Sequence, residues 1–127
     1  MSKKIINSKN APAPIGPYSQ AVQTGNLLFV SGQIAIDPST GQLKTASIEE
    51  QAKQVMENLK AVLAEAGLNF SHIIKTTIFL TSMSDFDAVN KVYGAYFSDN
   101  FPARETVAVA GLPKNVNVEI SVIASGN

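Results

Sequence analysis

Apolar and polar positions recur along this chain with two different periods, and the longer period predicts a helix over residues 47–66. The apolar positions of that segment fall on one helical face: Ile48, Ala52, Val55, Met56, Leu59, Val62, Leu63 and Ala66. Ser47 and Glu50 form a capping-box signal at its start, and Gly67 supplies a stop. A second helix is expected to begin at Ser84, with apolar positions along one side: Phe86, Val89, Tyr93 and Phe97.

Shorter β-rich runs predict strands before, between and after the two helices. The turn pair Gly25-Asn26 separates two of these runs and signals a two-residue hairpin. The expected strands cover residues 21–24, 27–31, 72–81, 104–110 and 116–124, with Ile5-Ile6 a candidate for a short extra strand. Prolines make residues 8–19 irregular, and the apolar Ile15 and Tyr18 indicate that this segment lies against the body.

The expected order β-β-α-β-α-β-β over residues 1–127 predicts a single α+β domain, with two helices packed on one face of a mixed sheet. The opposite sheet face would then be apolar and uncovered, and its area would exceed a normal surface patch on a monomer. We therefore expect the chain to assemble through that face, with closed cyclic symmetry as the usual arrangement.

Composition excludes several kinds of chemistry. Ten basic and ten acidic residues give a formal net charge of +0, which lacks the basic footprint of nucleic-acid-binding proteins. The chain has no cysteine and a single histidine, His72, so a disulfide, a thiolate nucleophile and a multi-histidine metal site are excluded. No apolar run approaches membrane-spanning length and the first residues have no secretory apolar core, so we expect a cytoplasmic protein without membrane contact.

Arg104 is the only arginine among nine lysines, and it stands where a strand is expected to begin. A guanidinium is a planar two-pronged donor that grips a carboxylate or a phosphate with two parallel hydrogen bonds. A chain that uses lysine for all its other basic positions is expected to use arginine here for geometry. The alternative is a strand-edge ion pair with an acidic neighbour such as Glu105. The residues alone indicate a small-anion site around Arg104 without specifying a reaction.

Other candidate residues have structural alternatives. Glu119 is a carboxylate in a strongly apolar strand, and burial in a cleft would raise its pKa toward neutrality; spacing alone slightly favours a solvent-facing position. Ser31-Gly32 ends a strand where glycine lets a ligand approach the backbone. Tyr18 offers a hydroxyl and an aromatic wall, or plain packing. His72 is expected to be a capping or surface residue.

Eight segments of the chain carry a likeness to a known family: residues 11–20 (APAPIGPYSQ), 30–34 (VSGQI), 54–63 (QVMENLKAVL), 66–68 (AGL), 75–80 (KTTIFL), 85–93 (DFDAVNKVY), 101–104 (FPAR) and 112–120 (LPKNVNVEI). In order and spacing they resemble the RidA/YjgF family nearly end to end. The resemblance implies a chorismate-mutase-like α+β fold assembled as a homotrimer with clefts between subunits. It also implies deamination of reactive enamines and imines without a cofactor: 2-aminoacrylate or 2-iminopropionate to pyruvate and ammonia, and 2-iminobutyrate to 2-ketobutyrate.

The resemblance also implies roles for individual residues. Arg104 matches the arginine that holds the substrate carboxylate, and Glu119 matches the carboxylate that orients or activates water. The other matching or cleft-lining positions are Tyr18, Ser31, Gly32, Phe86, Asn90 and Thr106. The chain departs from the family at Glu105, where a small residue is usual, and at Thr106, where cysteine is common. Ala108 and Gly111 replace a frequent glutamate and arginine.

Two other functions remain open at this point. One is an endoribonuclease or translation inhibitor, an activity attached to older names of the family, although zero net charge makes RNA cleavage physically awkward. The other is a non-catalytic sensor that binds 2-keto acids at the same cleft. Turnover of an imine would distinguish the deaminase from the sensor.

Overall fold

Six strands form one mixed sheet in the order β1-β2-β3-β6-β4-β5 in the computed structural model, which describes residues 2–126. The strands are β1 (Lys4–Ile6), β2 (Ala21–Thr24), β3 (Leu27–Gln33), β4 (Ile73–Leu80), β5 (Ala103–Ala108) and β6 (Val118–Ser125). Neighbouring strands are antiparallel except β4 and β5, which run parallel and are joined by a helical crossover. The hairpin at Gly25-Asn26 and the short strand at Ile5-Ile6 are confirmed.

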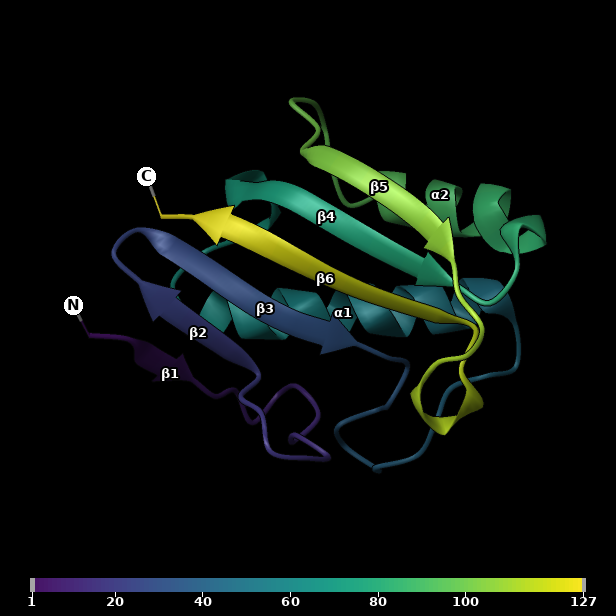
Figure 1. Cartoon of the computed structure of the whole chain (residues 1–127), viewed down its shortest axis with the longest axis horizontal. Coiled ribbons are helices and arrows are strands. Elements are labelled where there is room, and N and C mark those ends of the chain that lie inside the picture. Colours follow the sequence, from purple (N-terminus) through teal and green to yellow (C-terminus); the bar gives the residue numbers. More distant parts are fainter. Residues whose placement is uncertain (1, 127) are drawn as a thin grey trace.

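Two helices, α1 (Ile48–Glu65) and α2 (Phe86–Gly94), lie behind the sheet on one of its faces (Figure 1). The predicted α+β class, the mixed sheet and the one-sided helix layer are therefore confirmed. The Ser47 hydroxyl accepts a hydrogen bond from the Glu50 N–H at 3.0 Å and begins α1 where the sequence indicated. Gly67 follows the helix at a φ of 77°, a left-handed conformation that glycine adopts readily.

The second helix begins later than the expected position at Ser84. The Ser82 hydroxyl accepts a hydrogen bond from the Ser84 N–H, which tightens the first turn into a short 3-10 helix, η2 (Met83–Asp85). The helix then ends at Gly94, so the prediction that Phe97 belongs to it is wrong. The Phe97 ring still packs on Tyr93, with 4.8 Å between ring centroids.

His72 precedes β4 as the last residue of a second 3-10 turn, η1 (Phe70–His72), so the strand does not begin at residue 72 as expected. Its Nδ1 accepts a hydrogen bond from the Asn69 N–H at 3.1 Å. A third such turn, η3 (Pro113–Asn115), delays β6 to Val118. The expected capping role of His72 is confirmed.

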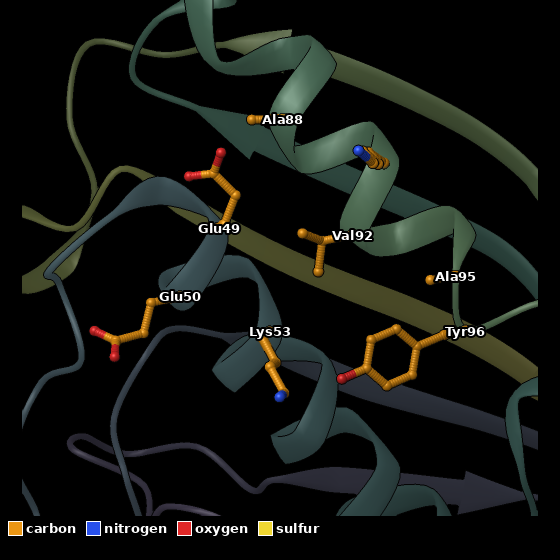
Figure 2. A pocket seen from close by; sticks show the side chains of 8 residues that line it. Glu49, Glu50, Lys53, Ala88, Val92, Ala95 and Tyr96 are labelled. Atoms are coloured by element: carbon orange, nitrogen blue, oxygen red, sulfur yellow. The ribbon is translucent and has the colours of Figure 1, made fainter.

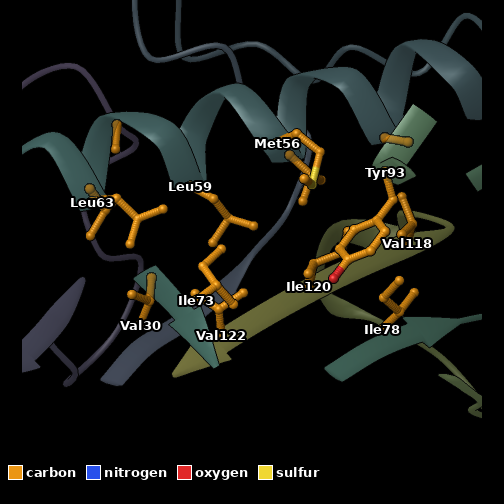
Figure 3. Close-up of a cluster of buried hydrophobic side chains, with 14 of the residues drawn as sticks. Val30, Met56, Leu59, Leu63, Ile73, Ile78, Tyr93, Val118, Ile120 and Val122 are labelled. Carbon is orange, nitrogen blue, oxygen red and sulfur yellow. The ribbon is translucent and has the colours of Figure 1, made fainter. Parts of the chain in front are cut away.

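The core lies between the helix layer and the sheet. Figure 3 shows Leu59 and Leu63 of α1 facing Val30 and Val122 of the sheet, and all four are buried. Burial of such side chains typically stabilises a fold by about 1.5–3 kcal/mol each. This buried layer joins the helices to one face of the sheet.

The opposite sheet face carries no helix. Strand register places four apolar side chains on that face, all of them exposed: Ile5, Leu27, Phe29 and Val107. The uncovered apolar face that the sequence predicted is present in the single chain. Within residues 2–126, no helix is both long and apolar enough to cross a membrane.

Candidate functional site

The two predicted catalytic side chains lie on opposite faces of the sheet. Arg104 pairs in register with Thr76, which is fully buried and shares a hydrogen bond with Tyr93 of α2, so Arg104 is on the helix side. Glu119 pairs with Phe79, the strand neighbour of the buried Ile78, so Glu119 points from the uncovered face. A single chain thus presents two separate half-sites.

The Arg104 half-site is a polar end on an aromatic wall. Arg104 Nη1 donates a hydrogen bond to Asn90 Oδ1 at 2.7 Å. Its guanidinium carbon lies 5.7 Å from the centroid of the Phe86 ring and 5.2 Å from that of Tyr93. The hollow beside it has a volume of about 340 Å³, and Phe101 also lines it.

No carboxylate of residues 2–126 forms an ion pair with Arg104. Glu105, the competing partner that the sequence suggested, points to the other face, where Lys75 lies 3.1 Å away and Thr77 donates a hydrogen bond to it. Both contacts lower the pKa of Glu105, the Thr77 hydrogen bond most strongly. The guanidinium therefore keeps donors for an anionic ligand.

Thr106 borders Arg104 and Asn90 in the same half-site. Its hydroxyl is buried and has no hydrogen-bond partner, which singles it out among the buried side-chain polar atoms of residues 2–126. A buried hydroxyl without a partner in the chain is unusual in folded proteins, and this one is free to bond a ligand in the half-site.

The Glu119 half-site is a hollow of about 420 Å³ lined by Ile15, Tyr18, Ser31, Gly32, Ile34, Pro113 and Glu119. Burial raises the pKa of Glu119 above its ordinary value of 4.5. In the part of the chain that the structure describes, the carboxylate has no hydrogen-bond or ion-pair partner. The alternative of a solvent-facing Glu119 is therefore wrong, because the side chain is half-buried. Its raised pKa is the kind of shift that suits a general base.

Gly32 lies in the β-bulge where the β3–β6 register shifts. A Cβ built on it would lie within 2.7 Å of the Glu119 Cδ atom. The absence of a side chain at Gly32 therefore makes room for the Glu119 carboxylate itself, a requirement that the sequence did not indicate.

Tyr18 and Ser31 are held by local hydrogen bonds. The Tyr18 oxygen accepts from the Ile15 N–H at 3.2 Å, which leaves its own proton for another acceptor. The Ser31 hydroxyl donates to the Ser19 carbonyl at 2.6 Å, so toward a ligand it can only accept.

Sequence reasoning missed two residues that shape these half-sites, Gln20 and Tyr93. The buried Gln20 amide holds the irregular segment beneath Tyr18: it accepts from the Ser8 N–H at 2.6 Å and donates to the carbonyls of Ser8 and Pro12. Tyr93 was assigned only to the apolar side of a helix. A glutamine in a proline-rich segment has no periodic signal that would have revealed its burial.

Another surface hollow, with a volume of about 710 Å³, lies between α1 and α2. Figure 2 shows Lys53 and Tyr96 at this hollow, with Val92 between the helices. None of the predicted site residues lines it. Within residues 2–126, no group of three or more His, Asp or Glu side chains is placed to hold a metal ion.

The chain as a whole is similar to known proteins. Residues 8–125 match the family model described as endoribonuclease L-PSP. The chain is 47% identical over 122 residues to the 2-iminobutanoate/2-iminopropanoate deaminase of Mus musculus, covering 96% of this chain and 90% of the mouse protein.

Two solved structures from E. coli are similar over nearly their whole length. The YjgF gene product superposes with a TM-score of 0.93 at 46% identity, covering 98% of this chain and 99% of the other. TdcF with bound serine superposes with a TM-score of 0.92 at 44% identity, covering 96% and 98%.

Proposed function

The chain belongs to the endoribonuclease L-PSP family, which includes the RidA/YjgF proteins that its sequence resembles, and from that premise we propose that it is a cofactor-independent deaminase of reactive 2-imino acids. Water adds to the C=N carbon of 2-iminopropionate, and the adduct expels ammonia to leave pyruvate. By the same route 2-iminobutyrate gives 2-ketobutyrate. The name of the mouse relative supports this reaction class.

In this proposal Arg104 binds the substrate carboxylate. The guanidinium has no acidic partner within residues 2–126, and Asn90 fixes one of its nitrogens at 2.7 Å. A two-pronged donor that is already oriented holds the planar substrate in one pose, which favours attack at the imine carbon. The unpartnered Thr106 hydroxyl supplies a further hydrogen bond beside the same anion.

Glu119 acts as the proton shuttle. Its carboxylate accepts a proton from the attacking water, so that the hydroxide adds to the carbon and the C=N electron pair moves to nitrogen. The nitrogen then takes that proton from Glu119, which gives the neutral carbinolamine. In a second transfer the Glu119 carboxylate takes the hydroxyl proton and passes it to the nitrogen, so that the C–N bond breaks, NH3 leaves and the C=O bond forms. The raised pKa of Glu119 suits both steps, because burial makes the carboxylate a stronger base than an ordinary one while it still returns its proton.

One observation carries the proposal: Arg104 and Glu119 lie on opposite faces of one sheet. One chain cannot bind a carboxylate at Arg104 and hydrate the adjacent carbon at Glu119. We place the complete site between chains, where Arg104 of one subunit meets Glu119 of its neighbour in a homotrimer. Assembly through the uncovered apolar face would bring Glu119 of that face against another chain.

Two assays test the proposal. An enzyme that generates 2-aminoacrylate is mixed with the purified chain, and pyruvate release is followed in the presence of wild type, Arg104→Ala or Glu119→Gln. We expect acceleration by the wild type alone. Pyruvate release at the spontaneous rate with the wild type would refute the deaminase. Binding of 2-ketobutyrate without turnover would then favour the sensor.

Mixing the two inactive variants tests the shared site. Each cleft of a mixed assembly takes one Arg104 and one Glu119 from different chains, so random reassociation at equal amounts restores about a quarter of wild-type activity. Each variant refolded alone supplies the control. Labelled chains show whether the subunits have exchanged. If they have exchanged and the mixture stays inactive, both residues of a working site belong to one chain, and the proposal of a shared site is contradicted.

A further inference from the structure

The Arg104 guanidinium is bordered by two aromatic rings, those of Tyr93 and Phe86, at 5.2 and 5.7 Å from its central carbon. Both rings come from α2, while Arg104 is on β5, the edge strand of the sheet. An arginine on an edge strand would otherwise sample many rotamers. The rings attract the cation through their electron-rich faces and restrict where its plane can lie.

Tyr93 is itself fixed from behind. It is 4% exposed, and its hydroxyl lies 2.9 Å from the hydroxyl of the fully buried Thr76. Thr76 is the register partner of Arg104 on the adjacent strand. Thr76 is therefore linked to Arg104 in two ways. One is the backbone pairing of the two strands, and the other is the pair of side-chain contacts from Thr76 to Tyr93 and from Tyr93 to Arg104.

From these contacts we infer that Tyr93 is a positioning residue for Arg104. Its ring, anchored by the hydrogen bond to Thr76, holds the guanidinium in the orientation that binds the substrate carboxylate. The carboxylate role rests on the proposed function, whereas the orientation of Arg104 does not. An arginine held in place before binding loses less side-chain entropy when the anion arrives. Loss of the ring should therefore weaken binding more than it slows the chemical step.

Tyr96 provides a matched control close to Tyr93 in the chain. Its ring packs on Phe70 with 5.2 Å between centroids, and its hydroxyl donates to Glu57 at 2.7 Å. Like Tyr93 it is a hydrogen-bonded aromatic residue, although it is half-buried where Tyr93 is buried. Within residues 2–126 the Arg104 guanidinium contacts the rings of Phe86 and Tyr93 and not that of Tyr96. Tyr96→Leu should cost stability without affecting the arginine.

The sequence offers a direct readout, because Arg104 is the only arginine. The Nε–Hε signal of the ¹⁵N-labelled chain therefore reports on Arg104 without ambiguity. In the wild type we expect this signal to be shifted by the ring currents of Tyr93 and Phe86. In Tyr93→Leu it should move toward the position of a free arginine side chain, and in Tyr96→Leu it should stay.

The kinetic test separates binding from chemistry. For Tyr93→Leu we expect KM for the imine and the inhibition constant of 2-ketobutyrate to rise about tenfold, with kcat within about twofold of wild type. Tyr93→Phe keeps the ring and loses only the anchor, so a rise of about threefold is expected. Thr76→Val should produce the same rise, and combining it with Tyr93→Phe should add nothing, because both changes remove one hydrogen bond.

An unmoved Nε signal in Tyr93→Leu overturns the inference whatever the activity of the chain. Equal shifts in Tyr93→Leu and Tyr96→Leu also overturn it, because they indicate general loosening. If Tyr93→Leu fails to fold, Tyr93→Phe and Thr76→Val decide, and an unchanged signal in both is again contrary. A moved signal in a wild-type chain that hydrolyses no imine would support the positioning role and refute only the proposed reaction.

Discussion

The carboxylate of Glu119 lies directly against the backbone of Gly32, in the space that a side chain at residue 32 would occupy. The contact joins the β-bulge of β3 to the middle of β6. Gly32 has no left-handed φ, so its conformation does not require glycine. Glycine is required because the Glu119 carboxylate approaches the backbone too closely for any side chain. The position of the proposed proton shuttle thus depends on the absence of a side chain at Gly32, and the strands β6 and β4 separate Gly32 from Arg104 in the sheet.

Gly32→Ala should therefore impair catalysis while leaving the fold intact. The added Cβ must displace the Glu119 carboxylate, because it would lie within 2.7 Å of Cδ. We expect kcat to fall about tenfold or more. Gly111→Ala is the matched control, since a Cβ there meets no atom within 4 Å. Unchanged kcat in Gly32→Ala would show that the carboxylate position does not matter for turnover.

Periodicity made most of the fold predictable. The apolar face of residues 47–66, the hairpin at Gly25-Asn26 and the β-rich runs identify elements whose core faces are set by burial. Element ends were less accurate, because capping by Ser82 in place of Ser84 depends on one hydroxyl contact. Such local competition leaves no periodic signal.

The candidate site was only partly predictable. Alternation places side chains within one strand, and in β5 it turns Glu105 away from the face of Arg104. Alternation does not say which side chains of two different strands share a face of the sheet, because that is set by the register between the strands. The pairs Thr76–Arg104 and Phe79–Glu119 alone place the two proposed catalytic groups on opposite faces.

The raised pKa of Glu119 predicts an acid limb in the pH profile. Only the ionised carboxylate accepts a proton from water, so kcat should fall as pH decreases through the Glu119 pKa, which lies above 4.5. The profile of kcat between pH 4 and pH 9 measures this limb. An acid limb centred below the ordinary carboxylate value would contradict burial as the cause.

Glu119 should also make the free energy of unfolding depend on pH, with a sign opposite to that of an ion-paired carboxylate. Because burial raises its folded pKa, the folded chain binds this proton more tightly than the unfolded chain. That contribution is fully present below about pH 4.5 and is lost as pH rises through the folded pKa. Glu119→Gln should thus melt higher than wild type at neutral pH, and the difference should vanish in acid.

Arg104→Lys tests geometry separately from charge. Lysine keeps the positive charge and loses the planar fork, so kcat/KM should fall roughly 100-fold. The melting temperature should change little, because Arg104 has no ion pair within residues 2–126 and its hydrogen bond to Asn90 is exposed. Steady-state kinetics and thermal melting of the same preparation measure both. Full activity in the lysine variant would remove the proposed role of the fork.

Thr106→Val distinguishes a binding hydroxyl from a structural one. Valine has nearly the same shape, and it removes a buried oxygen that has no partner in the folded chain. Without ligand the variant should be as stable as wild type or more stable by about 1 kcal/mol. If the hydroxyl bonds the substrate, KM should rise about tenfold at the same time. Thermal melting with and without 2-ketobutyrate measures both effects, and Thr77→Val, on the opposite sheet face, is the control. A variant that loses stability without ligand would instead assign the Thr106 hydroxyl to the fold.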